Sequence, residues 1–390
     1  MIIPPQLSHL PAPAPEAAAL SDQLSTLIAQ EIAAAGGWIS FARYMELALY
    51  APGLGYYSAG SRKLGESGDF VTAAEMSPLF ARCIARQLAQ LHAEGLRSVL
   101  EIGAGSGALA VELLLEMQAL GCVPDAYLIL ELSGDLRERQ RTIIAQRAPT
   151  LLNRVRWLDE LPTPFEGVIL ANEVLDATPA HVITTCGGEV LESCVKHDNS
   201  RNLFHWFETR ASEDIRRATD GIQLLDNYRT EINLTSRALV NSLARLLTRG
   251  VMLFIDYGFP AREFYHPQRS AGTLMCHYRH HAHDDPFAFV GLQDITTHVD
   301  FSAIAAAAQE SGAALLGYAT QANFLINCGM TELLSATPAD DARAYAPLAA
   351  QAQKLLSPAE MGELFKVIAL GKNIDTALLG FARGDKSHTL

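Results

Sequence analysis

Val99-Leu100-Glu101-Ile102-Gly103-Ala104-Gly105-Ser106-Gly107-Ala108-Leu109 is the stretch that decides the fold of this chain. An apolar run leads into three glycines at alternate positions, and a helical pattern follows them. Because glycine tolerates positive φ and has no Cβ, the backbone can turn sharply here and lie directly against a ligand. A glycine-rich turn between a strand and a helix is typical of α/β folds that bind nucleotide-like cofactors.

Two acidic residues accompany the glycines. Glu101 precedes the first glycine, and Glu131 ends the next apolar run along the chain. A carboxylate at the end of the second strand of such a fold can hold the ribose hydroxyls of the cofactor. Two cofactors fit this arrangement, S-adenosylmethionine and a dinucleotide.

The glycine spacing matches a pattern for each of these cofactors. The dinucleotide pattern is Gly103-x-Gly105-x-x-Ala108, and the adenosylmethionine pattern is Glu101-x-Gly103-x-Gly105-x-Gly107. The second pattern accounts for more residues, because Glu101 could meet the cationic amino-acid end of adenosylmethionine but has no task beneath a pyrophosphate. A glycine-rich turn that binds no ligand is the remaining alternative.

The composition is that of an ordinary soluble globular protein. The chain has 390 residues, of which 49% are hydrophobic and 19% are charged. Its formal net charge of -13 argues against a nucleic acid partner, since nucleic acid binding draws on basic surface. The six cysteines are dispersed and form no C-x-x-C pair, which is typical of reduced thiols in the cytosol.

The sequence shows no segment for export or for membrane insertion. No apolar run approaches the length of about 20 residues that a transmembrane helix needs. The Pro- and Ala-rich beginning lacks the regions of a signal peptide, and the first basic residue, Arg43, comes too late for a mitochondrial presequence. We therefore expect a cytoplasmic protein.

From residue 98 onward, short apolar runs alternate with helical patterns, which predicts a parallel, doubly wound α/β sheet. The strands that we expect in its core are 98–103, 125–131, 154–158, 166–172, 251–256, 313–319 and 365–371. The last two strands form a hairpin-like pair with an excursion between them. This order favours the mostly parallel, seven-stranded Rossmann-like sheet of methyltransferases over a dehydrogenase, which usually adds a second domain.

We divide the chain into a flexible tail (1–18), a region of helices and loops that covers the site (19–95) and a methyltransferase domain (96–390). In the second region, helices are expected from Ser21 to the Gly36-Gly37 pair, from Ser40 to about Leu49 and from Ser77 to about Glu94, with a long loop between the last two. The third region carries insertions at about 181–232, 257–300 and 321–362. The first insertion contains two strand-like runs, the second is expected to be a loop or lid, and the third is helical.

The fourth core strand ends in residues that can carry chemistry. Ligands of open α/β sheets bind at the carboxyl ends of the strands, so Asn172, Glu173 and Asp176 are expected near the cofactor. Two carboxylates three residues apart could hold a guanidinium by charge-assisted hydrogen bonds and orient it for methyl transfer. The alternative is a capped helix start, with Asp176 serving a turn before a proline.

Residues 68–80 combine an acid, a hydroxyl and a second acid before a helix that begins with Ser77-Pro78. Asp69 and Thr72 are predicted to contact the cofactor, and Glu75 could reach the cofactor or the substrate. The alternative is that Glu75 and Ser77 serve only the N-terminus of the helix.

Two further segments carry polar side chains. Four histidines between residues 277 and 283 precede Asp284-Asp285, but their spacing matches no zinc pattern, and we expect no metal. Asp256-Tyr257-Gly258 ends a core strand and could line the mouth of the substrate site, or could simply form the turn that ends the strand.

These residues together resemble the MidA-type methyltransferases, whose mitochondrial members are complex I assembly factors that methylate an arginine. The resemblance extends from about residue 38 to residue 371, and the Gly-Asp-Phe and Asn-Glu-Val-Leu-Asp segments are the most specific to this family. The matching segments are residues 44–50, 53–57, 68–72, 77–80, 101–107, 172–176, 256–258, 272–274 and 298–301. The chain departs from the family at Ala74, where proline is common, and at Ala81, where glycine is common.

The resemblance implies S-adenosylmethionine as cofactor, with Gly103, Gly105 and Gly107 as its floor and Glu131 as the ribose acid. It also implies an arginine side chain of a protein as substrate, possibly in a subunit of respiratory complex I. The lack of a presequence fits a bacterial member of the family, whose substrate need not be the mitochondrial one. Two alternatives stay open, a dinucleotide-dependent oxidoreductase and a non-catalytic assembly factor that uses the fold to bind a partner.

Overall fold

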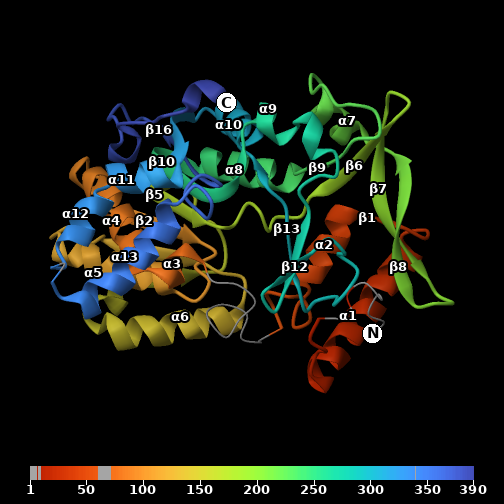
Figure 1. The fold of residues 1–390 in the computed structure, drawn as a ribbon, viewed down its shortest axis with the longest axis horizontal. Coiled ribbons are helices and arrows are strands. Elements are labelled where there is room, and N and C mark those ends of the chain that lie inside the picture. Colours follow the sequence, from red (N-terminus) through yellow and green to blue (C-terminus); the bar gives the residue numbers. More distant parts are fainter. Residues whose placement is uncertain (1–6, 8–9, 60–71, 339) are drawn as a thin grey trace. The chain divides into compact units, whose positions relative to one another are not determined.

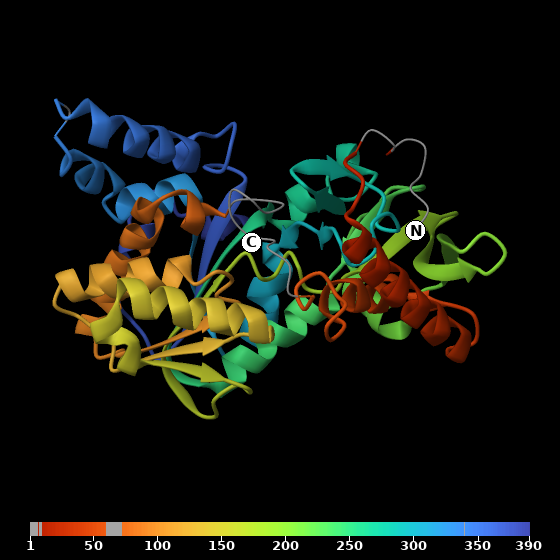
Figure 2. The same ribbon diagram turned by 90° about the horizontal axis from the view of Figure 1, so that it is seen from below.

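The fold is described from a computed structural model of the chain, which covers residue 7 and residues 10–59, 72–338 and 340–390. Its contacts divide the chain into two compact units. Unit 1 consists of Met1–Phe70, Asp176–Arg237 and Arg262–His298, and unit 2 of Val71–Leu175, Ala238–Ala261 and Val299–Leu390. Figures 1 and 2 show the ribbon of the chain from two directions.

Unit 2 is built on the predicted seven-stranded sheet, in the order β15-β16-β10-β5-β2-β3-β4. Strands β2, β3, β4, β5 and β10 run parallel to one another, whereas β16 runs antiparallel to both β10 and β15. A short strand, β14, adds to the end of β10. The strands are β2 (Ser98–Ile102), β3 (Ala126–Leu130), β4 (Val155–Leu158), β5 (Phe165–Asn172), β10 (Leu247–Phe259), β14 (Val299–Asp300), β15 (Ala314–Thr320) and β16 (Phe365–Lys372).

Helices cover both faces of this sheet, because alternate residues of its strands point to opposite sides. Val168 and Leu170 of β5 belong to the core beneath α4 and α5, whereas Ile169 and Ala171 belong to the core that contains residues of α8 and α10. The helices of this part of the chain are α3 (Ala73–Met76), α4 (Pro78–Ala93), α5 (Ala108–Ala119), α6 (Gly134–Arg147), α8 (Leu234–Leu246), α10 (Phe301–Glu310), α11 (Gln321–Asn327), α12 (Met330–Ser335) and α13 (Ala342–Leu356), with 3-10 turns at η2 (Pro149–Arg154), η4 (Leu379–Phe381) and η5 (Ser387–Thr389).

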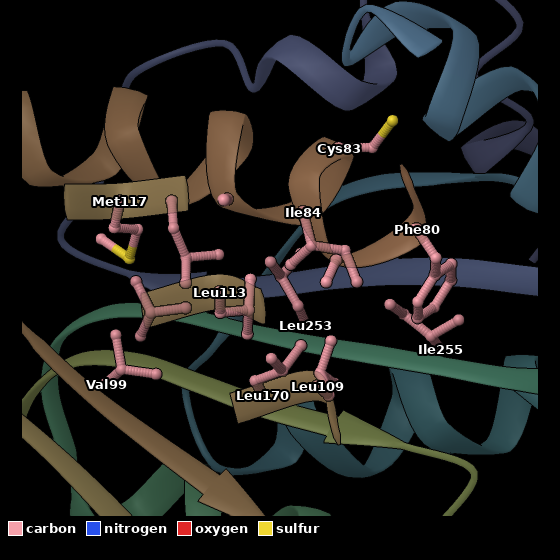
Figure 3. Close-up of a cluster of buried hydrophobic side chains, with 14 of the residues drawn as sticks. Phe80, Cys83, Ile84, Val99, Leu109, Leu113, Met117, Leu170, Leu253 and Ile255 are labelled. Carbon is pink, nitrogen blue, oxygen red and sulfur yellow. The ribbon is translucent and has the colours of Figure 1, made fainter. Parts of the chain in front are cut away.

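The core between the sheet and α4 and α5 fixes the position of the glycine turn. Figure 3 shows Leu109 and Leu113 of α5 packed with Ile84 of α4 over Leu170 and Leu253 of the central strands. Full burial of one such side chain contributes about 1.5–3 kcal/mol. The helix that follows the glycines is therefore held firmly against the sheet.

Unit 1 contains two antiparallel sheets and the N-terminal helices. The larger sheet has the order β1-β7-β6-β9, with β8 on the free side of β7, and the smaller has the order β12-β11-β13. Its elements are α1 (Pro15–Ala34), β1 (Ile39–Ser40), α2 (Phe41–Tyr50), β6 (His181–Cys186), β7 (Glu189–Asp198), β8 (Leu203–Arg210), α7 (Glu213–Thr219), β9 (Arg229–Ile232), α9 (Ala261–Phe264), η3 (Pro267–Arg269), β11 (Met275–Tyr278), β12 (His281–His283) and β13 (Asp294–Thr296). None of the described helices is long and apolar enough to cross a bilayer.

The sequence missed this second unit. Its three segments are separated by parts of unit 2, so the chain has no linear boundary that composition could reveal. Each segment buries apolar side chains against the others, as Ile28 of α1, Val182 of β6 and Ile295 of β13 share one core. The chain between residues 19 and 95 is also divided, because α4 belongs to unit 2.

Two local expectations need correction. The segment 257–300 is not only loop, since it contains the β12-β11-β13 sheet, whose β11–β12 turn has positive φ at Arg279 and His280. Such a turn is usually marked by Asn-Gly or Asp-Gly, so its sequence gave no signal of a hairpin. Helix α1 begins at Pro15 rather than Ser21, because proline fits the first helical turn and alanines continue the helix. The predicted tail 1–18 is thus helical in its last four residues.

Candidate functional site

The glycine turn lies between β2 and α5, as the sequence predicted. Gly103, Gly105 and Gly107 have φ of 66°, 54° and 84°, a conformation that residues with a Cβ rarely adopt. The N–H of Gly103 donates to the carbonyl of Leu130 at 3.0 Å, so the turn begins beside the end of β3. A Cβ at Gly107 would lie 3.1 Å from Cα of Gln140, because α6 packs closely against the turn.

Glu101 is buried directly beneath this turn, with 3% of its surface exposed. Tyr127 of β3 donates its hydroxyl hydrogen to Oε2 of Glu101 at 2.7 Å. Burial raises the pKa of Glu101 to about 7, although the hydrogen bond from Tyr127 lowers it and the charge of Glu131 raises it. The carboxyl group of Glu101 therefore changes its charge near neutral pH.

Glu131 follows the last residue of β3 and belongs to a hydrogen-bonded network that includes the turn. Its Oε1 accepts from the N–H of Ser133 at 3.0 Å, and its Oε2 accepts from Nε2 of Gln140 at 3.1 Å. The same Nε2 donates to the carbonyl of Gly105 at 2.9 Å, and Oε1 of Gln140 accepts from Trp157 at 2.9 Å. Burial raises the pKa of Glu131, while its hydrogen-bond donors oppose that shift.

The ends of β3 and β4 are fixed by a single arginine. Arg137 donates to the carbonyl oxygens of Glu131 and Leu158, each at 2.6 Å, and pairs with Asp159 at 2.6 Å. Leu132, which follows Glu131, is 78% exposed. This edge of the sheet therefore offers a ligand one apolar side chain, that of Leu132, and one polar group, the carboxylate of Glu131.

Asn172 and Glu173 stand at the carboxyl end of β5, in unit 2. Nδ2 of Asn172 donates to Oε1 of Glu173 at 3.0 Å, and Oδ1 of Asn172 is buried without a hydrogen-bond partner in the described part of the chain. Glu173 has a positive φ of 53°, and its N–H donates to the carbonyl of Ile255. A non-glycine residue in this conformation stores strain, which is often found at functional sites.

Asp256, at the end of β10, shapes the segment after Glu173. Its Oδ2 accepts from the N–H groups of Val174 and Leu175 at 3.2 and 2.9 Å, and its Oδ1 accepts from the N–H of Tyr257. The motif Asp256-Tyr257-Gly258 therefore has a structural task, which is to hold the end of β5 in place.

The other predicted site residues fall in different places. Asp176 is the first residue of the middle segment of unit 1, whereas Glu173 belongs to unit 2. Asp69 lies outside the described residues. Thr72 precedes α3 and makes no hydrogen bond from its hydroxyl to that helix, whereas Ser77 caps α4 through the N–H of Leu79 at 3.2 Å.

The histidine-rich segment forms the β11–β12 hairpin. Over the described ranges, no group of three or more His, Cys, Asp or Glu side chains is arranged to hold a metal ion. Burial lowers the pKa of His283, which also stacks edge-on against Phe289.

Sequence reasoning missed three residues that organise the site, Tyr127, Gln140 and Trp157. Tyr127 stands out only as a polar-tipped residue in an otherwise aliphatic strand. Gln140 lies mid-helix in a strongly polar segment, and Trp157 lies in a strand of only four residues, so neither could be distinguished from surface residues. Their roles depend on contacts between elements that are far apart in the chain.

Residues 79–319, more than half of the chain, match a protein family described as "Putative S-adenosyl-L-methionine-dependent methyltransferase". The chain belongs to this family. Methyltransferase activity and the adenosylmethionine cofactor, both predicted from the glycine turn and the resemblance, are confirmed. The oxidoreductase alternative is thereby set aside.

Solved structures and curated relatives agree with this assignment. A Burkholderia thailandensis protein described as a "likely methyl transferase", with S-adenosyl-homocysteine bound, is 51% identical and has a TM-score of 0.94 over 98% of this chain and 100% of its own. "Protein arginine methyltransferase NDUFAF7, mitochondrial" of Danio rerio is 28% identical over 86% of this chain and 84% of its own length. The Homo sapiens protein of the same name is 26% identical over 86% and 80%.

The residues of unit 2 fit the cofactor of this methyltransferase family. The positive-φ glycines let the backbone approach a ligand, and the oriented carboxylate of Glu131 is an acceptor suited to hydroxyl groups. Glu101 adds a buried carboxyl group. The cationic amino-acid end of the cofactor would favour the charged form of this group.

Proposed function

We propose that this methyltransferase modifies an arginine side chain of a protein. The relatives named above carry protein arginine methylation in their names and align with more than four fifths of the chain. The arrangement at the end of β5 supports the same substrate class. We further propose, from the resemblance, an acceptor among the subunits of respiratory complex I and a cytoplasmic site of action.

The observation that carries the proposal is the pair of acceptors at Asn172 and Glu173. Because Nδ2 of Asn172 is engaged by Glu173, the buried Oδ1 of Asn172 is left as an acceptor that needs an N–H donor. The carboxylate of Glu173 is also an acceptor, and it carries charge. A guanidinium offers five N–H donors and a positive charge, so it matches both groups.

The chemistry that the cofactor supplies is a methyl group on a sulfonium: the C–S bond breaks with its electron pair kept by sulfur, and a C–N bond forms to the substrate. Oδ1 of Asn172 would orient the N–H groups of the nitrogen to be methylated. Glu173 would accept the proton that this nitrogen loses and release it to water. Asp256 holds both residues in position through the backbone of the next two residues.

The prediction that Asp176 joins Glu173 in holding the guanidinium stays a prediction. Only two residues separate these acids in the chain. Its test uses Asp176→Asn beside the Glu173 variant, since both should impair transfer while leaving cofactor binding intact.

The test uses Glu173→Gln, which keeps the shape of the side chain and removes its charge. The full chain is incubated with radiolabelled adenosylmethionine and an extract of cells that lack the enzyme, and the labelled protein is hydrolysed to identify the methylated amino acid. We expect methylarginines with the wild type and a loss of about 10²-fold or more with Glu173→Gln. Calorimetry with S-adenosyl-homocysteine should give nearly equal affinities for both.

The exposed Glu160→Gln in unit 2 is the matched control and should transfer normally. Label on lysine or on a carboxyl group instead of arginine would contradict the proposed substrate. Normal transfer by Glu173→Gln would remove Glu173 from the mechanism.

A further inference from the structure

Unit 2 buries a lysine that the proposed mechanism does not use. Lys366 lies near the start of β16 and is only 4% exposed. Lysine is almost never fully buried unless it is paired, because its ammonium group is costly to remove from water. We therefore expect the charge of Lys366 to serve a purpose that an apolar side chain at this position could not.

The ammonium group of Lys366 lies against the last residues of β10. Because β16 runs antiparallel to β10, the beginning of β16 lies beside the carboxyl end of β10. Nζ of Lys366 donates to the carbonyl oxygens of Glu363 and Leu364, the latter at 3.2 Å. The carbonyl of Leu364 also accepts from the N–H of Gly258 at 3.4 Å. On the other side, the centroid of the Phe259 ring lies 5.4 Å from Nζ.

Asp256 is the residue of β10 directly opposite Lys366. The two are Cα partners in the pairing of β10 with β16, and the side chains of such a pair point to the same face of the sheet. Their Cβ atoms are therefore about 4.5–5.5 Å apart. Asp256 is 1% exposed, so an acidic and a basic side chain are both withdrawn from water at neighbouring positions. Their opposite charges attract more strongly than they would in water, because the interior has a lower dielectric constant.

The carboxylate of Asp256 needs a nearby cation to do its work. Its Oδ2 accepts from the N–H groups of Val174 and Leu175. Hydrogen bonds to an ionised acceptor are roughly twice as strong as those between neutral groups. Burial favours the neutral form of a carboxyl group, whereas a neighbouring cation favours the charged form. Lys366 is placed to supply that cation.

The conformation of Glu173 depends on the backbone that Asp256 holds. The φ of 53° at Glu173 is unfavourable for a residue with a side chain, and such a conformation persists only where the surrounding structure enforces it. The N–H of Glu173 donates to the carbonyl of Ile255, and the next two N–H groups donate to Asp256. All three hydrogen bonds tie this segment to the end of β10 that faces Lys366.

We propose that Lys366 is a positioning residue for methyl transfer, which acts through Asp256 on Glu173. The inference rests on the proposed function, because it takes Glu173 as a group that meets the substrate. The ammonium group keeps the carboxylate of Asp256 charged, and the charged carboxylate holds the backbone after Glu173. That backbone in turn fixes where the side chain of Glu173 lies. Lys366 itself has no part in the bonds that form and break.

Two neutral variants test the proposal in the full chain, with radiolabelled adenosylmethionine and the cell extract as acceptor. Lys366→Met removes the charge and the N–H donors, whereas Lys366→Gln removes the charge but keeps N–H donors for the backbone carbonyls. Because a displaced Glu173 misplaces the substrate, we expect both variants to lose about 10- to 100-fold in the rate at saturating adenosylmethionine. The KM for adenosylmethionine, and the affinity for S-adenosyl-homocysteine measured by calorimetry, should change by less than about twofold.

A lysine of the same strand provides the matched control. Lys372→Met, at the other end of β16, should transfer normally. A normal rate in Lys366→Gln would show that the N–H donors of Lys366 matter and its charge does not, which would overturn the proposal.

A double-mutant cycle with Asp256→Asn shows whether Lys366 acts through Asp256. In the Asp256→Asn background there is no carboxylate to keep charged, so Lys366→Met should lower the rate by less than about a further twofold. An equal loss of rate in both backgrounds would mean that the two residues act independently, and would also overturn the proposal.

The outcome is separate from that of the proposed function. If Glu173→Gln loses transfer but Lys366→Met keeps the wild-type rate, the positioning role is wrong and the arginine activity stands. If Glu173→Gln transfers normally, the proposed role of Glu173 fails, and the effect of Lys366 on it fails too. If the wild type methylates a residue other than arginine, the proposed substrate is wrong, and the double-mutant cycle still decides whether Lys366 acts through Asp256.

Discussion

At the scale of single residues, the site depends on carboxyl groups whose pKa values are raised by burial. Glu101 has its pKa raised to about 7, and Glu131 has its pKa raised in spite of its hydrogen-bond donors. Keeping such groups under a turn costs folding free energy. A cationic or hydroxyl-bearing ligand that interacts with these carboxyl groups would offset that cost, which is typical of a functional site.

Replacing Glu101 by Gln should stabilise the ligand-free protein above pH 7. Since the folded pKa lies above the unfolded value, stability from this group is full below about pH 4.5 and is lost as pH rises to 7 and beyond. The loss amounts to about 3 kcal/mol at most. Urea unfolding at pH 5 and pH 8 measures it, and the variant should lose less stability between the two pH values than the wild type does.

The same variant should bind adenosylmethionine more weakly at pH 8, because Gln lacks the charge. Equal pH dependence in both proteins would show that Glu101 does not titrate in this range.

Replacing Glu131 by Ala should weaken binding of S-adenosyl-homocysteine by about tenfold or more, because ribose hydroxyls would be buried without their acceptor. Calorimetry measures the change. Glu138→Ala, on the exposed side of α6, provides the control and should bind normally. An affinity for Glu131→Ala within twofold of wild type would place the ribose elsewhere.

At the scale of elements, the site is the meeting point of four strand ends. The β2–α5 turn, the end of β3 and helix α6 are joined by Gln140, which contacts Gly105, Glu131 and Trp157 together. The ends of β5 and β10 are joined by Asp256. These two connections orient the polar groups before any ligand binds, which lowers the ordering cost of binding.

Gly105→Val should abolish detectable cofactor binding. Valine is strained at a φ of 54° and would place a branched side chain where the backbone approaches the ligand. Gly121→Val is the matched control, since Gly121 has a φ of 71° at the end of α5 and open space around it. The control should lose stability but keep its affinity for S-adenosyl-homocysteine, as measured by calorimetry. Equal binding by Gly105→Val and the wild type would remove the cofactor from this turn.

At the scale of the whole molecule, unit 1 contains a buried carboxylate, that of Glu231, which holds backbone N–H groups of the same unit. Both oxygens of Glu231 accept from the N–H of Thr273, and one also accepts from the N–H of Leu274. The hydroxyl oxygen of Thr273 in turn accepts from the N–H of His298. A Cβ at Gly272 would lie 2.3 Å from Oε1 of Glu231, so only glycine fits there.

Glu231→Gln should loosen unit 1 and leave the cofactor site of unit 2 unchanged. An amide turns one acceptor into a donor that faces other donors, at a cost of about 1–3 kcal/mol. Hydrogen exchange followed by mass spectrometry should show faster exchange at residues 271–276 and 296–298. Peptides covering 126–133 should exchange as in the wild type, and faster exchange there would contradict the expectation that the effect is confined to unit 1.

The sequence by itself determined the doubly wound sheet and the glycine turn, and it favoured adenosylmethionine over a dinucleotide as the cofactor. These features depend on local rules: Val99–Leu109 has an apolar strand, alternating glycines and a helical pattern within eleven residues. The helices expected from Ser40 and from Ser77 do begin after these residues, because a helix cap needs only the next two or three residues.

Only the tertiary structure decided that the chain forms two interleaved units, and that Tyr127, Gln140 and Trp157 support the two acids. It also decided that the carboxylate of Asp256 holds backbone N–H groups more than eighty residues away. Contacts of this kind join residues whose separation in the chain carries no periodic signal. Their energy is gained only when packed elements bring the partners together and exclude water, so no short window of sequence can reveal them.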